Sequence, residues 1–320
     1  MRCEDLSPVA RSVLVQDDGV VDAYLARLNE RSAALDDHED EEYVRSVSAV
    51  PYCKNIGISN LLTEFGVHPG PVVLDVMGGA GQIALAARRY GLAPAAIEII
   101  TADHDTRHVV QADRHHLPAV ALDVTDLSIV APESVDHVLM AHHVHHLSPS
   151  ERLRAVGEIV RCLRSDGTLV IYEGPDTSTT AHLSDTVVDE LSGVPHRFRH
   201  PGREELVSLA DYPRLTGQET TSVDSPLVFL AEDVRQAREL ATEYFIAHYS
   251  LRPGTTWEQL SSQLHLAYMR ARVADNLHVG ALPDGMLTRL FPNPADRQEY
   301  LDQACVVVRR EGLIVKARKR

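Results

Sequence analysis

From residue 71 onward, short aliphatic runs alternate with amphipathic segments. The aliphatic runs are rich in valine, isoleucine and leucine and have the length of strands; they cover 71–76, 97–103, 119–124, part of 133–144, and 168–173. The segments between them carry apolar residues at helical spacing, most clearly at 81–91, 105–116 and 151–164. Strands that alternate with helices predict an open, mainly parallel sheet covered by helices on both faces.

The two flanks of this alternation have a different pattern. The first flank places apolar residues at near-helical spacing, namely Val21, Tyr24, Leu25, Leu28 and Leu35. After Pro175 the pattern predicts helices, including a long one at 256–277, one strand at 222–230, and strand-type runs around Glu311-Gly312. We therefore predict an α/β fold. It is a doubly wound, mainly parallel seven-stranded sheet with an N-terminal helical segment and a helical insertion before the last strand.

The same pattern divides the chain into four segments. Its 320 residues suffice for one large domain or two modest ones. We expect an N-terminal helical cap, then the alternating core, then a mixed, mainly helical insertion on the substrate side, and finally the strand or strands that complete the core sheet. Their predicted ranges are 1–65, 66–176, 177–299 and 300–320.

Composition and charge narrow the class of protein. Hydrophobic residues make up 44% and charged residues 24%, which is ordinary for a globular protein, and the net charge of −15 disfavours a nucleic-acid partner. No apolar run approaches the roughly 20 residues of a membrane span, and no secretory signal pattern is present. The four cysteines form no CxxC pair, so neither a zinc ribbon nor a dithiol redox motif is indicated. We expect a cytoplasmic protein.

Candidate chemistry lies at the ends of the predicted strands. In open α/β sheets, ligands bind at the carboxyl ends of the parallel strands, so residues at these ends share one edge. The first three strands end in acids, the fourth is followed by a histidine, and the fifth ends in a tyrosine and an acid. These residues are Asp75, Asp103, Asp123, His142 and Tyr172-Glu173.

The glycine loop after the first strand, in PVVLDVMGGAGQIAL, allows two interpretations. Gly79-x-Gly81-x-x-Ala84 fits a loose dinucleotide fingerprint, which would predict a nicotinamide or flavin protein with Asp103 on the ribose. However, Asp103 lies later than the usual spacing, and a carboxylate at Asp75 would repel a pyrophosphate. Asp75 suits a cationic ligand better. S-adenosylmethionine carries a sulfonium and an ammonium and no phosphate, so it is the favoured ligand.

Five ordered motifs carry a family resemblance. VVLDVMGGAGQIAL, TADHDTRHV, VALDVTDL and VDHVLMAHHVHHL resemble, in turn, the first four motifs of class I S-adenosylmethionine-dependent methyltransferases of the small-molecule type. GEIVRCLRSDGTLVIYE resembles the helix, turn and fifth strand of the same core. Each motif alone is weak, but order and spacing match over about residues 66–175. The resemblance implies that 66–176 is a Rossmann-like core that binds S-adenosylmethionine.

The resemblance assigns cofactor-binding roles to the first two motifs. Asp75 would orient the methionine end of the cofactor, and Gly79 and Gly81 would let the backbone pass close to it. Asp103 would accept hydrogen bonds from both ribose hydroxyls, and His104 would lie near the adenine.

The third and fourth motifs supply the remaining cofactor contacts that the resemblance implies. Asp123 would accept a hydrogen bond from the adenine amino group, with the Val124 amide nearby. Ala141 and His142 would line the cofactor where the fourth strand ends.

One loop position departs from the family pattern. Met77 stands where the family usually has glycine, and Gly78 follows it, so the loop keeps flexibility although its path can differ. Two interpretations are open: Met77 packs beneath the loop, or it marks a differently bent cofactor.

Methyl transfer itself needs few catalytic groups, because the sulfonium is a good leaving group and the enzyme mainly positions the nucleophile. If the nucleophile arrives protonated, a histidine of HHVHHL could act as the base, and His142 is the first candidate after the strand. Tyr172 could offer its ring face to the sulfonium. The alternatives are structural histidines and a tyrosine hydrogen-bonded to solvent. HHVHHL lacks the carboxylate of an HExxH metal motif, so we expect no metal.

We predict an S-adenosylmethionine-dependent methyltransferase that transfers a methyl group in line to a small molecule, of specialised-metabolite or amino-acid-like type. A second hypothesis keeps the fold and cofactor but transfers the aminocarboxypropyl arm, or cyclises it to azetidine-2-carboxylate, and releases methylthioadenosine. A third is a non-catalytic protein that binds S-adenosylmethionine. We expect a small-molecule substrate, no nucleic acid and no membrane as partners, and we allow for a homodimer.

Overall fold

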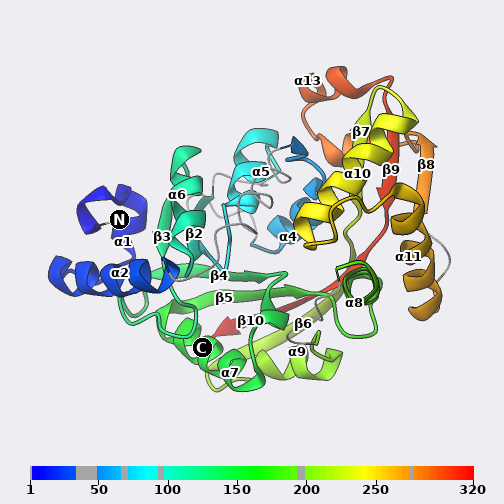
Figure 1. The fold of residues 1–320 in the computed structure, drawn as a ribbon. Coiled ribbons are helices and arrows are strands. Elements are labelled where there is room, and N and C mark those ends of the chain that lie inside the picture. Colours follow the sequence, from blue (N-terminus) through cyan, green and yellow to red (C-terminus); the bar gives the residue numbers. More distant parts are fainter. Residues whose placement is uncertain (1, 34–48, 66–70, 93–96, 193–198, 274–276) are drawn as a thin grey trace.

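A mainly parallel seven-stranded sheet forms the centre of the protein (Figure 1). The computed structural model describes residues 2–33, 49–65, 71–92, 97–192, 199–273 and 277–320. The strand order is β3-β2-β1-β4-β5-β10-β6, and only β10 runs antiparallel to its neighbours β5 and β6. The strands are β1 (Val72–Val76), β2 (Glu98–Asp103), β3 (Ala119–Ala121), β4 (Val135–Ala141), β5 (Leu163–Glu173), β6 (Leu215–Asp224) and β10 (Glu311–Lys319). The predicted fold class is confirmed.

Helices cover both faces of this sheet. In Figure 1, α4, α5 and α6 lie on one side of it, and α7 and α9 lie on the other. Local sequence sets the helix ends: Ser148 and Glu151 form a capping box at α7, and α5 lies between Gly81 and Gly91, both in left-handed conformation. The bounds are α4 (Asn55–Leu62), α5 (Gln82–Tyr90), α6 (Thr106–Arg114), α7 (Pro149–Cys162), α8 (Thr179–Leu191) and α9 (Arg203–Leu209).

A second, smaller sheet stands beside the first. Its antiparallel strands have the order β7-β9-β8, and α10 packs against β7 and β9. The elements of this part are β7 (Leu227–Ala231), α10 (Val234–His248), α11 (Trp257–Arg270), β8 (Leu277–Ala281), α12 (Met286–Leu290), α13 (Pro294–Arg297), η4 (Gln298–Tyr300) and β9 (Ala304–Val308).

The run predicted as one strand at 222–230 is two strands in two different sheets, so that prediction is wrong. β6 ends at Asp224 and β7 begins at Leu227. Pro226 lies between them and has no N–H to continue a ladder. The hydrogen bonds therefore place β6, inside the predicted 177–299 insertion, in the main sheet, and place β9 in the small one. The four-segment division itself stays a prediction.

The N-terminal helices pack against the loops of the main sheet. They are η1 (Cys3–Asp5), α1 (Pro8–Ser12), α2 (Asp18–Ser32) and, before β1, η2 (Thr63–Phe65). Helix α2 buries four of its five predicted apolar residues, and Leu35 lies outside the described residues. The Tyr24 hydroxyl donates to the Asp126 carbonyl over 2.6 Å and accepts from the Asp123 N–H over 2.9 Å. These two bonds fix α2 to the turn after β3. None of the described helices is long and apolar enough to cross a membrane.

Candidate active site

Parallel pairing brings the predicted strand-end residues to one edge of the main sheet. Asp75 is the penultimate residue of β1, and Asp103, Ala141 and Glu173 end β2, β4 and β5. The register places Ala141 opposite Tyr172. Just beyond β4, the His142 N–H donates to the Tyr172 carbonyl over 2.8 Å, and the two rings meet edge to face at 4.4 Å between centroids.

The loop after β1 is held against the end of β2. The Gly78 N–H donates to the Ala102 carbonyl, and the Gly79 N–H donates to Oδ2 of Asp103, each over 2.9 Å. A Cβ at Gly78 would lie 2.8 Å from Oδ2 of Asp75, so only glycine fits there. One at Gly81 would meet Leu117 and Thr101, so this glycine also permits close packing of α5 on the sheet.

Met77 has a backbone φ of +60°, in the left-handed region that favours glycine. This conformation gives a physical reason for the glycine that the family usually has at this position. The methionine side chain is partly buried and packs against the core. The loop thus adopts a glycine-type conformation with a methionine in it.

Asp75 is a buried acid at the end of β1. The residue is 1% exposed, and neither of its carboxylate oxygens accepts a hydrogen bond from the described part of the chain. Burial, and then the charge of Asp103, raises its pKa to about 8. A carboxyl group that burial leaves without a partner is stabilised by a cation, so this position fits the sulfonium and ammonium end of S-adenosylmethionine.

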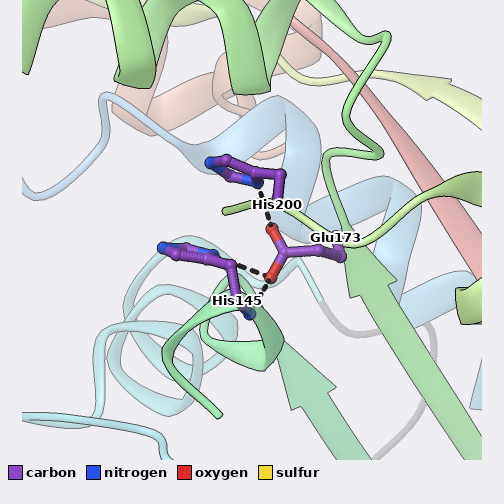
Figure 2. A group of neighbouring side chains, drawn as sticks. All are labelled: His145, Glu173 and His200. Atoms are coloured by element: carbon purple, nitrogen blue, oxygen red, sulfur yellow. Dashed lines mark hydrogen bonds and ion pairs between the residues drawn. The ribbon is translucent and has the colours of Figure 1, made fainter. Parts of the chain in front are cut away.

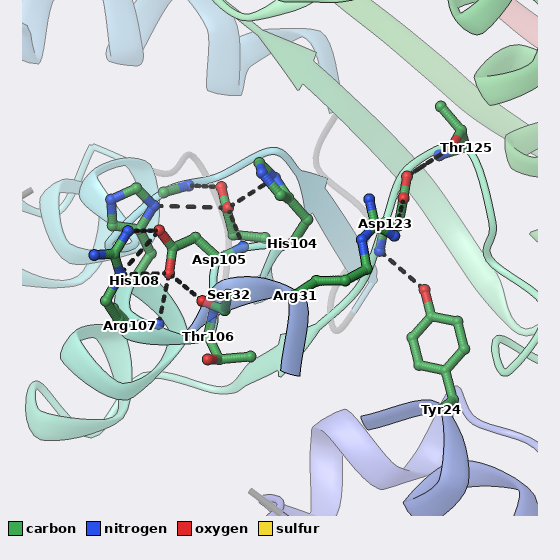
Figure 3. Close-up of polar contacts among 12 residues, drawn as sticks. Tyr24, Arg31, Ser32, His104, Asp105, Thr106, Arg107, His108, Asp123 and Thr125 are labelled. Carbon is green, nitrogen blue, oxygen red and sulfur yellow. Dashed lines mark hydrogen bonds and ion pairs between the residues drawn. The ribbon is translucent and has the colours of Figure 1, made fainter. Parts of the chain in front are cut away.

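Asp103 differs from Asp75 in that its pKa is lowered, and its neighbours His104, Asp105 and His108 are labelled in Figure 3. Its Oδ1 accepts from the Asp105 N–H over 2.9 Å, and Nδ1 of His104 and of His108 lie 3.4 and 3.6 Å from the same oxygen. Burial alone would raise the pKa of Asp103, but the hydrogen bond from His108 and the charges of both histidines lower it overall. Asp103 is therefore an ionised acceptor, as hydrogen bonding to ribose hydroxyls requires.

Asp123 lies on the turn after β3, and its carboxylate already has protein partners (Figure 3). Oδ1 accepts from the Thr125 N–H and hydroxyl over 2.9 and 2.7 Å, and Oδ2 accepts from Nη1 of Arg31 over 3.1 Å. Burial opposes ionisation, but these bonds lower the pKa of Asp123 overall. The neighbouring Val124 is buried, and the predicted adenine contacts of both residues remain predictions.

A second group of polar residues lies at the end of β5: His145 from η3 (Val144–His146), Glu173 and His200 (Figure 2). Nδ1 of His145 lies 2.9 Å from Oε2 of Glu173, and Nδ1 of His200 lies 3.6 Å from Oε1. The two rings stack at 4.3 Å between centroids. Burial opposes ionisation of Glu173, but the charges and hydrogen bonds of both histidines hold its pKa well below the usual range.

The donor atoms of this group lie within 4.8 Å of one another, close enough for a metal ion. However, the Gly174 and His145 N–H groups also donate to Oε1 and Oε2 of Glu173, over 2.9 and 3.2 Å. Nδ1 of His200 has the Gly174 carbonyl at 2.9 Å. Hydrogen bonds therefore account for the geometry of the cluster. Sequence reasoning missed His200, because no motif links it to β5.

The histidines directly after β4 are neutral near pH 7. Burial, and then the charges of Lys54 and Arg310, hold the pKa of His142 well below its usual range. Burial, and then the charge of His145, lower the pKa of His143 to about 4. Both residues remain partly exposed, so each neutral imidazole can form a hydrogen bond with a bound molecule. Tyr172 is buried, and burial raises the pKa of its hydroxyl.

Comparison with known proteins agrees with this geometry. Residues 74–171 match a family model described as a methyltransferase domain. Among solved structures, the YcgJ protein from Bacillus subtilis is similar at 17% identity and a TM-score of 0.50, over 83% of this chain and 98% of that one. A putative methyltransferase from Bacillus halodurans C-125 has 14% identity and a TM-score of 0.49, over 82% and 98%. No curated protein matches the chain.

At these identities the solved structures show the fold alone, and the domain match covers under half of the chain. Residues 74–171 are similar to a methyltransferase domain. The match confirms the predicted resemblance to class I S-adenosylmethionine-dependent methyltransferases, and with it S-adenosylmethionine as the cofactor of this domain.

Proposed function

We propose that the protein transfers a methyl group from S-adenosylmethionine to a small-molecule acceptor. The observation that carries this proposal is the carboxyl group of Asp75. It lies buried at the end of β1, within the matched residues 74–171, and no described residue donates a hydrogen bond to it. A cationic cofactor offsets the cost of this buried acid, whereas a dinucleotide phosphate would increase it.

Different residues would bind different parts of the cofactor. Asp75 would hold the cationic methionine end, and Asp103 would accept from the ribose hydroxyls while it fixes the loop through Gly79. When bound, S-adenosylmethionine supplies an activated methyl group, so the protein needs chiefly to orient the acceptor and exclude water.

For the remaining positions, we keep the adenine and loop contacts that the sequence resemblance implies. His104 would lie near the adenine, Asp123 and Val124 would face its amino edge, and Ala141 would line the cofactor at the end of β4. Met77 and Gly78 would shape the loop beneath it.

His142 is the proposed base for an acceptor that arrives protonated. It is neutral near pH 7, it is partly exposed, and its backbone is fixed by the bond to Tyr172. The Tyr172 ring, edge-on to His142, would lie on the sulfonium side.

A small acceptor is favoured over a macromolecule. The charges of His142 and His143 contribute to the lowered pKa of His248, so the end of α10 lies close to the strand ends. A helix end this close to the strand ends would help to enclose a small substrate.

The test is to incubate the purified protein with S-adenosylmethionine, alone and with candidate acceptors, and to identify the nucleoside released. S-adenosylhomocysteine that appears only with an acceptor supports methyl transfer. Methylthioadenosine would replace this proposal by aminocarboxypropyl chemistry. Tight S-adenosylhomocysteine binding without turnover of any acceptor would favour the non-catalytic alternative.

A further inference from the structure

Two buried cations, Lys54 and Arg310, lie near the proposed active site, and no acid among the described residues forms an ion pair with either. Lys54 is 8% exposed and Arg310 is 3% exposed. Among the described residues, Lys54 has neither a hydrogen bond nor an ion pair from its side chain, and Nη2 of Arg310 is buried without a partner. Nε of Arg310 donates to the Ser225 carbonyl over 3.1 Å. Buried cations are rare unless an anion compensates them.

The backbone holds both cations where the chain passes between the two sheets. Lys54 directly precedes α4, and the carbonyl of its neighbour Cys53 accepts from the Val228 N–H over 3.0 Å. Arg310 joins β9 to β10, and its carbonyl accepts from the Ser225 N–H over 2.8 Å. A Cβ at Gly57 of α4 would lie 2.2 Å from Oγ of Ser225, so α4 packs tightly on this junction. These contacts fix the backbone at both residues and bring it close to Ser225 and α4.

The groups around the two cations belong to the proposed active site. The charges of Lys54 and Arg310 both lower the pKa of His142 and of His248, which remain partly exposed. The tyrosines that interact with the charge of Arg310 are Tyr172, Tyr244 and Tyr249. Glu173 is an acid whose charge raises the pKa of His142, but its two carboxylate oxygens pair with His145 and His200. Within the described ranges, Lys54 and Arg310 therefore face imidazoles and phenols, and no acid there forms an ion pair with either cation.

We propose that Lys54 and Arg310 form a subsite that binds the carboxylate of the acceptor. This inference rests on the proposed function and narrows its substrate class to carboxylic acids. A carboxylate can accept hydrogen bonds from both the ammonium and the guanidinium, and it would compensate two charges that burial leaves with little access to water. The methionine end of S-adenosylmethionine carries the same group, so the experiment has to separate the two sources.

The experiment uses acetate, the smallest carboxylate with a methyl group, as the probe. Carbon-13 line broadening of labelled acetate is followed on addition of the full chain at constant ionic strength, first alone and then with saturating S-adenosylhomocysteine. Lys54→Met and Arg310→Met are compared with Lys316→Met, whose ammonium pairs with Glu64 on another part of the surface at 3.4 Å. Lys54→Arg tests whether charge alone restores binding.

We expect acetate to bind the wild-type protein with S-adenosylhomocysteine present. We expect both subsite variants to weaken acetate at least tenfold, and Lys54→Arg and Lys316→Met to bind like wild type. Loss of acetate on addition of S-adenosylhomocysteine would overturn the assignment, because the cofactor's own carboxylate would then fill the subsite. The assignment would also be overturned if the wild type did not bind acetate, or if Lys54→Met and Arg310→Met bound acetate as tightly as the wild type. Failure of the wild type to bind S-adenosylhomocysteine would instead refute the proposed function.

Discussion

Replacing Asp75 by asparagine should stabilise the unliganded protein while it weakens the cofactor site. The substitution keeps the size and polarity of the side chain but removes its ability to ionise. In the folded protein the pKa of Asp75 is raised from 3.8 to about 8, whereas in the unfolded chain it returns to its ordinary value. Between these two values the unfolded state loses a proton that the folded state keeps. The stability of the wild type therefore falls as the pH rises through this window.

The magnitude follows from the width of the window. One pKa unit corresponds to about 1.4 kcal/mol, so the wild type loses about 1.4 kcal/mol per pH unit from this group. The asparagine variant does not lose stability in this way, because its side chain does not ionise. Its advantage in the free energy of unfolding should therefore grow by about 4 kcal/mol between about pH 5 and pH 8, and level off above pH 8.

The measurement is urea denaturation of the unliganded wild type and variant at several pH values in this range. Asp105→Asn is the matched control, because Asp105 accepts from Ser32 and Arg107 and its pKa is lowered. This control should lose about 1–2 kcal/mol at pH 7 and recover as the pH falls. A difference between Asp75→Asn and wild type that does not change with pH, or that makes the variant the less stable protein at pH 8, would refute the reasoning. S-adenosylhomocysteine should raise the melting temperature of the variant less than that of the wild type.

Three further predictions concern the polar networks. Glu173→Gln should lower the free energy of unfolding by about 3–5 kcal/mol, because it leaves two buried histidines without their acid; Glu239→Gln, in an exposed pair, should change it by less than about 0.5 kcal/mol. The Glu173 contribution should be present above pH 4.5 and be lost as the pH falls through the lowered pKa of Glu173. The His200 contribution should be complete below pH 6.5 and be lost as the pH rises through the raised pKa of His200. In urea titrations, the free energy of unfolding of Glu173→Gln should therefore fall furthest below that of the wild type between pH 4.5 and pH 6.5. Tyr24→Phe should cost about 1–2 kcal/mol in urea denaturation, since it removes both hydroxyl bonds between α2 and the turn after β3, and an unchanged midpoint would argue against this docking. Dialysis against EDTA should leave turnover and melting temperature unchanged, and a loss that Zn²⁺ restores would show that the His145, Glu173 and His200 cluster holds a metal.

Features that depend on neighbouring residues could be predicted from the sequence. The alternating runs predicted the parallel strands, and the Ser148 to Glu151 spacing is sufficient for the capping box of α7. Asp75 and Asp103 could be assigned to one edge of the sheet because parallel strands place their carboxyl ends together. The run at 222–230 was misjudged because its apolar pattern continues past Pro226, although the hydrogen-bond ladder cannot.

The protonation states could not be predicted in the same way. Asp75 and Asp103 are the same residue type at similar strand-end positions, yet burial raises the pKa of one and hydrogen bonds lower that of the other. The difference depends on which N–H groups and histidines reach each carboxylate. A sequence pattern does not contain this information.

The sequence by itself determined the strand and helix order, the glycine loop and the acids at the strand ends, since each follows from spacing along a short stretch of chain. Only the tertiary structure decided which distant side chains meet. His200 reaches Glu173 from the segment before α9, and Lys54 and Arg310 come together from opposite ends of the chain. Burial then gives these groups their chemistry, because a charge removed from water must find a partner in the protein or in a ligand.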